Sequence, residues 1–426
     1  MKDKIHRYAM TLGPGALFAS AAIGASHLVQ STRAGAEFGL VMIIFVVLAN
    51  MFKYPFFEFS TRYTSGTGIS IINGYGLLGR RYLALYFGAT VASMFFVTAA
   101  VGVVTSGLLE NLLRVEFLGE WSLPILFVVC VAILIIGRYS VLDSLIKMIG
   151  AVLLISTVLA LAAALWNGPI EAAPGFEVPG LFTQVGIFFL IALMGWMPMP
   201  LDLSSWQGLW AIERIKQTSF RPRMYEALVD FGVGYVAAGV IAVFFIILGA
   251  YMFHGIGEGL PDDSASFAGK LVELYTSTIG EWSGVVMSAS VFSVMFGTVI
   301  AVLDGYTRVL AHTARLLIGK RSRSAGLTRP MYTLVVAMLA GGALLVAIQF
   351  SDSLSELVDF ATSVSFVIAP LVAVLNFRLV TGRYLQKKMQ PPAWLKTLAY
   401  AGIVFLTGSA VIFLLLKAGL PLWGVN

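Results

Sequence analysis

The sequence predicts an all-α polytopic membrane protein, and three observations lead to that fold class. Only 12% of the 426 residues are charged and 58% are hydrophobic, whereas a soluble chain averages about 25% charged residues. The mean hydropathy is +0.89. Apolar runs of about 20 residues, the length that crosses a bilayer, recur along the chain. Lipid is therefore the expected solvent, and residues 1–426 are expected to form a single transmembrane domain.

The apolar runs predict eleven transmembrane helices. Their approximate bounds are 11–33, 37–62, 82–113, 121–137, 142–166, 181–213, 225–253, 284–317, 330–350, 354–377 and 395–417. Two groups of five spans follow, about 11–166 and 181–377, with one extra helix at about 395–417. The segment 264–282 is expected to form a further helix at the surface.

The basic residues predict the orientation, because Lys and Arg favour cytoplasmic segments. With the N-terminus inside, 22 of the 28 Lys and Arg residues fall on the cytoplasmic side. The four on the outside are Arg33, Arg114, Lys270 and Lys417. This asymmetry predicts an integral protein of a bacterial inner membrane, with a cytoplasmic N-terminus and the C-terminus outside. It also explains the net charge of +6 by contact with anionic lipid, without a nucleic-acid partner.

Several classes of protein are disfavoured. The basic lead MKDKIHRYAM has no signal-peptide cleavage site after it, so the first span is expected to be retained. The single Cys130 leaves no disulfide framework and no cysteine metal site. There is no P-loop, no Gly-rich nucleotide motif and no Ser–His–Asp order. We therefore predict no enzyme activity and no cofactor, and expect transport driven by an ion gradient or by the solute's own gradient.

Helix-breaking residues interrupt the first and the sixth predicted spans. The first carries Gly24 to His27 at mid-depth, and the sixth contains ALMGWMPMPLDLSSWQGLW, residues 192–210. Pro198 and Pro200 each remove a backbone donor, and unwound backbone within a bilayer is stable only where it faces protein or water. A proline kink would explain the sixth span alone. Interruptions in the first span of both groups indicate a transporter binding site.

The residues beside the two interruptions are the candidate substrate-binding residues. They are Gly24, Ala25, Ser26, His27, Gln30, Met197, Met199, Asp202 and Trp206. Thioether and imidazole groups favour transition metals, so one hypothesis is a divalent metal cation bound by Met199, Asp202, His27 and unwound carbonyl groups. The other is a small organic or anionic solute held by helix-end N–H groups, His27, Gln30 and Trp206.

Two pairs at the i, i+4 spacing are further candidates, because ionisable residues inside a membrane are costly. Asp304 and Arg308, in TVIAVLDGYTRVLAH, could form an ion pathway or a self-neutralised pair. Arg33 and Glu37 could form an outer gate or a plain pair at a helix end.

Lys53 and Glu58 lie five residues apart in the second predicted span, in NMFKYPFFEF. We expect them to form a structural ion pair near the inner end of that span. There are two alternatives. The two residues could form a proton relay, or Lys53 could extend its ammonium group to the membrane interface.

Several segments are similar to the Nramp family of divalent-metal transporters. They are Gly13-Pro14, Ala34-Gly35-Ala36-Glu37-Phe38-Gly39, Met199-Pro200, Asp230 and Phe366 with Pro370. The second resembles the family's AGAxFG segment and the third the Met-Pro of its MPH motif. The resemblance implies a LeuT-type fold of two inverted five-span repeats, with spans one and six broken, and secondary transport by alternating access with proton or sodium coupling. It also adds Asp230 to the ion pathway and Ser363, near the family's span-ten Gln, to the site.

This sequence departs from the family pattern at the metal ligands. The family's Asp-Pro-Gly-Asn motif falls on Gly24 to His27, so Gly24 and His27 replace the metal-binding Asp and Asn. The His of the MPH motif falls on Leu201, and a second family His falls on Trp206. The resemblance therefore implies a divergent side branch with a rearranged metal site, or with another solute on the same scaffold. A non-transporting membrane sensor is a third possibility, and the sequence predicts no oligomeric state.

Overall fold

The computed structural model describes most of the chain. The described residues are 14–114, 119, 121–136, 139–256, 261, 263–319, 328–350 and 353–420, without the side chains of 16, 139–151, 217, 218 and 278. The start of the first predicted span, Gly13, and basic residues of the N-terminal lead and of the loop at 320–327 lie outside them. All regular elements in the described ranges are helices.

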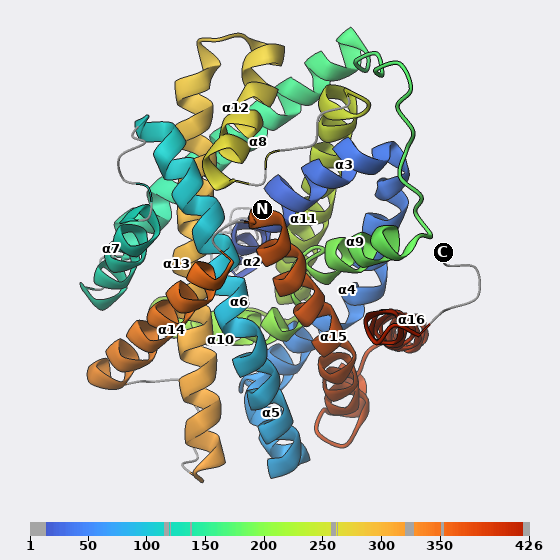
Figure 1. The fold of residues 1–426 in the computed structure, drawn as a ribbon. Helices are drawn as coiled ribbons and strands as arrows, with labels where there is room; N and C mark the ends of the chain where they lie inside the picture. The colour runs from blue at the N-terminus through green and yellow to red at the C-terminus, as the bar shows by residue number, and fades with distance from the viewer. Residues whose placement is uncertain are drawn as a thin grey trace, which may run out of the picture.

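The first half of the chain is helical (Figure 1). They are α2 (Pro14–Ala22), the π-helix η1 (Ser26–Ser31), α3 (Thr32–Phe38), the 3-10 helix η2 (Gly39–Val41), α4 (Met42–Thr67), α5 (Ile71–Leu78), α6 (Arg80–Leu113), α7 (Ser122–Ile136) and α8 (Tyr139–Asn167).

The second half contains the other interrupted span and the longest helix. Its elements are α9 (Gln184–Gly195), the 3-10 helix η4 (Leu201–Leu203), α10 (Ser204–Thr218), α11 (Met224–Phe253), α12 (Ser264–Ile279), α13 (Ser283–Leu317), α14 (Arg329–Gln349), α15 (Leu354–Thr381), the 3-10 helix η5 (Lys387–Met389) and α16 (Ala393–Lys417). The expected extra helix at 264–282 is confirmed as α12.

Seven helical stretches in the described part of the chain are long and apolar enough to cross a membrane. The apolar helices Ser122–Ile136, Val152–Asn167 and Gln184–Gly195 are shorter. The stretch Ser26–Thr67 has 42 residues, so its helical length of about 60 Å is twice the hydrocarbon thickness. It turns at Gly39, whose φ of 70° ends α3 before α4 begins. It therefore contains the end of the first predicted span and all of the second.

The interrupted elements lie at the centre of the bundle. α2 contacts α10, α11 and α13, while α9 packs against α15 and α4. The 3-10 helix η4 contacts α4, α6 and α15. α6 and α13 run side by side through the molecule (Figure 1). Both bends are therefore enclosed by protein, the surroundings that unwound backbone requires in a membrane.

Glycines allow α3 and α11 to touch backbone to backbone. A Cβ atom on Gly35 would lie 2.0 Å from the carbonyl oxygen of Ile246, and one on Gly249 would lie 2.2 Å from that of Thr32. Small residues at such crossings let membrane helices approach closely. The Ala34-Gly35-Ala36 segment is thereby explained by packing, independently of any ligand.

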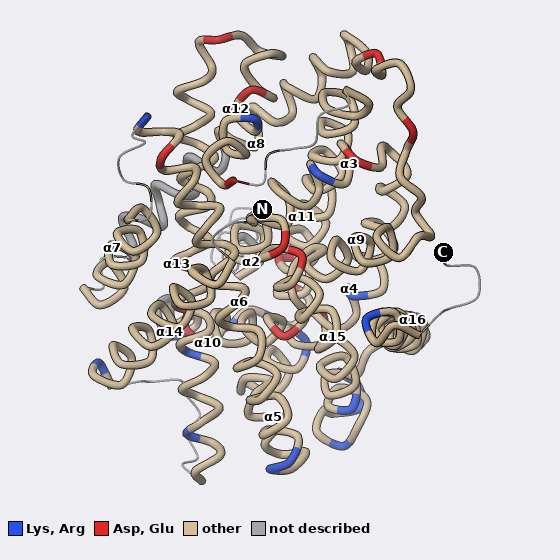
Figure 2. The backbone as a smooth tube through the Cα atoms, in the orientation of Figure 1, with Lys and Arg blue, Asp and Glu red and all other residues tan. Residues whose placement is uncertain are grey.

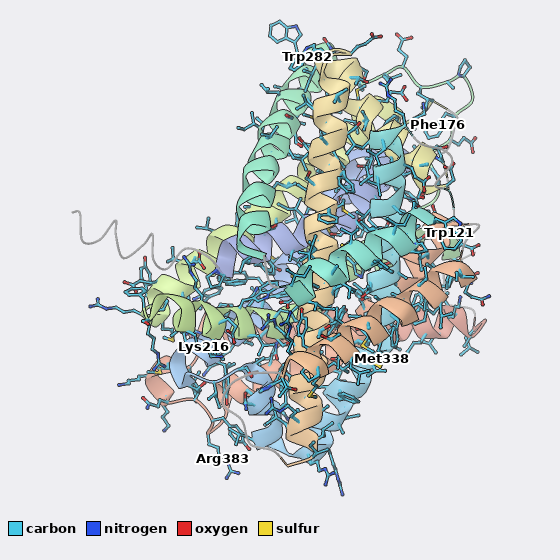
Figure 3. All side chains as sticks on the ribbon, turned by 90° about the vertical axis from the view of Figure 1, so that its left-hand side faces the viewer. Trp121, Phe176, Lys216, Trp282, Met338 and Arg383 are labelled. Atoms are coloured by element: carbon cyan, nitrogen blue, oxygen red, sulfur yellow. The ribbon has the colours of Figure 1, made fainter. Side chains whose placement is uncertain are left out.

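The surface has the features of a membrane protein. Large apolar side chains such as Trp121, Trp282 and Met338 are exposed (Figure 3). Figure 2 shows basic residues gathered at the lower end, around α5, the end of α13 and the α15–α16 connection, and mainly acidic residues at the upper end, around α12. The apolar flanks and charged ends indicate an integral membrane protein.

Candidate functional site

The first interruption lies between α2 and η1. α2 ends at Ala22, and the chain bends at Ile23 and Gly24 before the π-helix begins at Ser26. A Cβ atom on Gly24 would lie 2.9 Å from Cγ2 of Thr298, so α13 packs directly against this bend. A larger side chain at Gly24 would require Thr298 to move.

The second interruption separates α9 from α10. α9 ends at Gly195, residues 196–200 are not helical, and η4 leads into α10 at Ser204. Met197 and Met199 are both buried. A Cβ atom on Gly195 would lie 2.2 Å from the carbonyl oxygen of Thr362, which fixes the end of α9 against α15.

His27 is directed toward α11. Its Nε2 lies 3.0 Å from the carbonyl oxygen of Ala238, and its Nδ1 lies 2.8 Å from Oγ of Ser26. A carbonyl oxygen can only accept, so Nε2 carries a proton and donates. In this conformation both ring nitrogens are engaged, and a metal ligand role for His27 would require the ring to turn.

Asp202 is directed toward α6 and α13. Its Oδ2 accepts from Oγ of Ser93 at 2.8 Å and from the Tyr306 hydroxyl at 3.4 Å. Its Oδ1 is buried and has no partner among the described residues. A buried oxygen without a partner is costly, so this half of the carboxylate is available to a ligand.

Lys53 is not paired with Glu58, and that prediction was wrong. Glu58 pairs with Arg62, one turn along α4. The fully buried Lys53 instead donates from Nζ to the carbonyl oxygens of Met194 at 2.6 Å and Gly195 at 2.7 Å. Its amine therefore lies at the C-terminal end of α9, beside the second interruption.

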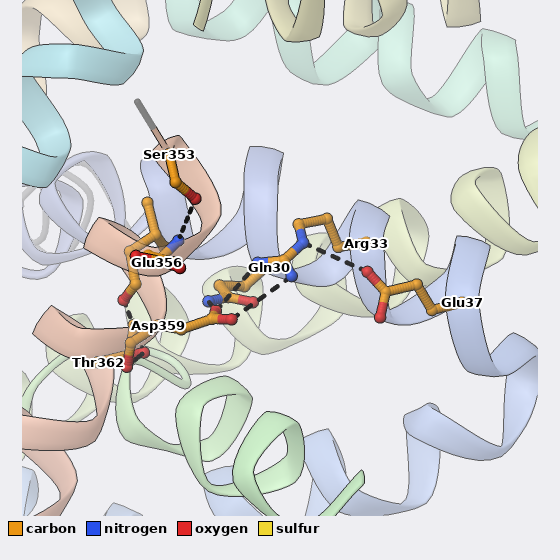
Figure 4. Close-up of polar contacts among 8 residues, drawn as sticks. Gln30, Arg33, Glu37, Ser353, Glu356, Asp359 and Thr362 are labelled. Carbon is orange, nitrogen blue, oxygen red and sulfur yellow. Dashed lines mark hydrogen bonds and ion pairs between the residues drawn. The ribbon is translucent and has the colours of Figure 1, made fainter. Parts of the chain in front are cut away.

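A polar cluster joins the far end of the first interrupted span to α15 (Figure 4). Arg33 lies 3.4 Å from Glu37 and 3.0 Å from Asp359 on α15. Gln30 donates to the same Asp359 carboxylate at 2.6 Å. The Arg33–Glu37 spacing was visible in the sequence. Asp359 was not, because it lies 326 residues from Arg33.

The predicted ion-pathway residues Asp304, Arg308 and Asp230 have partners of their own. Nε of Arg308 donates to Asp304 at 2.7 Å, and the Tyr332 hydroxyl of α14 donates to the other oxygen of that carboxylate at 2.7 Å. Asp230 accepts at 2.7 Å from the N–H of Gly15, at the start of α2. Asp304 and Arg308 therefore form the expected pair, and Asp230 holds one end of the interrupted span.

The remaining candidates surround the interruptions without joining into one cluster. Trp206 packs edge-on against Tyr306, with ring centroids 5.1 Å apart. Ser363 is buried on α15, next to the residue that contacts Gly195. No hydrogen bond in the described part of the chain joins any two of His27, Met199 and Asp202. The described residues also contain no group of three His, Cys, Asp or Glu side chains that could hold a metal.

The family model "Natural resistance-associated macrophage protein-like" matches residues 15–416. The chain belongs to this Nramp family. An uncharacterised protein of Pasteurella multocida is 35% identical over 425 residues, covering 98% of this chain and 95% of that protein. Members of the family are transporters rather than enzymes, so the expectation of a membrane transport protein is supported at the family level.

Solved structures support the fold. A manganese transporter of Eremococcus coleocola, crystallised as a point mutant, matches with a TM-score of 0.70 and 13% identity over 95% of this chain and 86% of its own. MhsT in complex with L-phenylalanine matches with a TM-score of 0.59 and 12% identity over 94% of this chain and 97% of its own. At these identities the likeness concerns the fold alone, and that fold is LeuT-like.

Proposed function

We propose that this protein is a secondary transporter that moves a divalent metal cation by alternating access, with the cargo held between the two interruptions. In this proposal the chain crosses the membrane eleven times, spans one and six are the broken spans, and the basic end in Figure 2 faces the cytoplasm. Membership of the Nramp family and the enclosed bends support it. The observation that carries it is the Oδ1 of Asp202, in η4 directly after the break, which is buried and has no partner among the residues that the structure describes.

The proposed metal ligands come from the break in span six. Asp202 would supply an oxygen and the buried Met199 a thioether sulfur, a set that suits a softer divalent cation such as Mn²⁺ better than Mg²⁺. His27 would join only after breaking its bond to Ala238. Gln30, Ser26 and the backbone at Gly24 would line the opposite side.

Mn²⁺ uptake by the purified protein in sealed liposomes, with Mg²⁺ as competitor, tests this proposal. Met199→Ala and Asp202→Ala should each lower uptake by about tenfold or more, because each removes a ligand. Met287→Ala is the matched control, because Met287 is an equally buried methionine near the start of α13. Wild-type vesicles without uptake, or two variants that transport like Met287→Ala, would contradict a metal site here.

A small organic or anionic solute is the second candidate cargo. Two observations favour it: the described residues contain no three-residue metal cluster, and Lys53 places an amine at the break. If Mn²⁺ is not taken up by folded protein, anions and small organic solutes are the next cargoes to assay. Binding without accumulation in the vesicles would indicate a sensor instead.

A further inference from the structure

The break in span six leaves two carbonyl groups, those of Met194 and Gly195, without their usual helical donors. In a continuous helix the carbonyl of Met194 would accept from residue 198 and that of Gly195 from residue 199. Residue 198 is a proline without an N–H, and the chain is not helical at Met199. The Met194 carbonyl accepts instead from the N–H of Trp196 and, at 3.4 Å, from that of Met197. The two oxygens therefore form an acceptor site at the C-terminal end of α9, in the protein interior.

Lys53 fills that acceptor site from α4. Its Nζ lies 2.6 Å and 2.7 Å from the two oxygens, distances at the short end of charge-assisted hydrogen bonds. The C-terminal end of a helix carries partial negative charge and stabilises a cation. The Asp202 carboxylate follows on the other side of the break, in η4. The two carbonyl oxygens carry this helix-end charge, so the buried amine lies where the potential is negative.

We propose that the Lys53 side chain is a tethered cation, whose ammonium group occupies a monovalent-cation site formed by the carbonyl oxygens of Met194 and Gly195. A free Na⁺ or K⁺ ion would need the same oxygens and is displaced by the lysine. The protein therefore requires no free monovalent cation at this position. The inference goes beyond the proposed function, because it holds for either cargo.

This assignment also constrains the charge at the break. Lys53 and Asp202 together contribute no net charge in their ionised forms, so the site is electrically balanced before any cargo enters. A divalent cation bound by Asp202 would lie near a fixed positive charge, which lowers its affinity. A shortened lysine should therefore make the site more attractive to cations of any kind.

Chemical rescue tests the proposal. Lys53→Ala deletes an n-propylammonium unit, so n-propylammonium chloride added to the purified variant should bind in the space and raise its melting temperature by about 2 °C or more. NH₄⁺ and K⁺ should stabilise the variant less, and tetramethylammonium, which cannot donate a hydrogen bond, should have no effect. Lys216→Ala, at a half-exposed lysine paired with Glu213, is the control for a general effect of amines. Neither it nor the wild type should respond.

A folded Lys53→Ala protein that responds equally to all of these salts, or to none, would overturn the proposal. If Lys53→Ala does not fold, Lys53→Met keeps the apolar stem, and NH₄⁺ is the probe. The wild type gives a further arm: replacing Na⁺ and K⁺ by N-methylglucamine should leave its melting temperature unchanged. A loss of stability in that arm would contradict a filled site, even if neither variant folds.

The stability readout separates this inference from the cargo. Wild-type protein that fails to take up Mn²⁺, together with a Lys53→Ala variant rescued by n-propylammonium, would reject the metal cargo and support the tethered cation. Normal Mn²⁺ uptake by the wild type, together with a folded Lys53→Ala variant that n-propylammonium does not stabilise, would support the metal cargo and reject the tethered cation.

Discussion

Asp359 joins two membrane segments that lie far apart in the sequence. Its carboxylate accepts from Gln30 and Arg33, which belong to the interrupted first span, while Asp359 itself is on α15. Arg33 is 8% exposed, so its charge depends on these acceptors more than a surface arginine would. Arg33 also contacts Glu37, but that residue is on its own helix and cannot hold α15.

Asp359→Asn is expected to loosen this contact on the proposed outer side. A partly exposed pair of this kind contributes about 1 kcal/mol, which corresponds to about a fivefold change in an equilibrium. A cysteine introduced by Ser363→Cys, one turn deeper on α15, should therefore react about five times faster with a thiol reagent added outside. Glu356→Gln is the control, because Glu356 is an exposed acid on the same helix. Equal labelling rates for Ser363→Cys alone, with Asp359→Asn and with Glu356→Gln would show that Asp359 does not close the outer side.

Single residues also show what the sequence could and could not reveal. The i, i+4 pairs were predictable, because helix geometry alone brings such residues together, and Asp304–Arg308 and Arg33–Glu37 are both in contact. The prediction of a Lys53–Glu58 pair was wrong, because Arg62 lies one full turn from Glu58 and is the better-placed partner. Lys53 finds its acceptors 141 and 142 residues away, and only the folded chain brings them together.

At the scale of elements, the helix crossings near the site depend on glycine rather than on apolar volume. α11 carries two instructive glycines. Gly249 lies against the backbone of α3, with 2.2 Å between a hypothetical Cβ and the Thr32 carbonyl oxygen, whereas a Cβ on Gly232 would meet nothing within 4 Å. Both lie inside the same helix, so they differ in packing and not in helix position.

Gly249→Ala should lower the free energy of unfolding by about 2 kcal/mol or more, because α3 must move away from α11 to admit the methyl group. Gly232→Ala should be neutral or slightly stabilising, since alanine is the better helix former. Melting temperatures of the two purified variants in the same detergent provide the comparison. A Gly249→Ala protein as stable as Gly232→Ala would mean that the two helices are not in contact in solution.

The sequence predicted the bounds of the long helices well but missed a short one. Long apolar runs placed α6, α11, α13, α14 and α15 to within a few residues of the expected bounds. The short α5 (Ile71–Leu78) was missed, because eight residues are too few to show as a membrane span. The polar Gly24 to His27 segment predicted the bend in the first span, yet the His27 side chain turns toward α11 rather than toward Met199 or Asp202. Composition marks where a helix is interrupted, whereas side-chain direction depends on the neighbouring helices.

At the scale of the whole molecule, the separation of basic and acidic residues predicts how the protein is oriented in the membrane. Basic residues gather at one end of the bundle and acidic residues mainly at the other (Figure 2). Because positive residues are retained on the cytoplasmic side during insertion, the α15–α16 connection should lie inside and the loop that precedes α9 outside. The Gln30–Arg33–Asp359 contact would then close the outer side of the cargo site, and Lys53 would lie between that contact and the cytoplasm.

Cysteine labelling in intact cells tests this orientation, and the chain is well suited to it because its single Cys130 is buried. Glu177→Cys places a thiol in the exposed loop before α9, and Lys388→Cys places one in the exposed α15–α16 connection. A membrane-impermeant maleimide should label Glu177→Cys in intact cells and Lys388→Cys only after permeabilisation. The unsubstituted protein should stay unlabelled in both conditions. The opposite pattern would invert the molecule and place the Asp359 contact on the cytoplasmic side, while labelling of both thiols in intact cells would put the two loops on the same side and rule out the eleven-span arrangement.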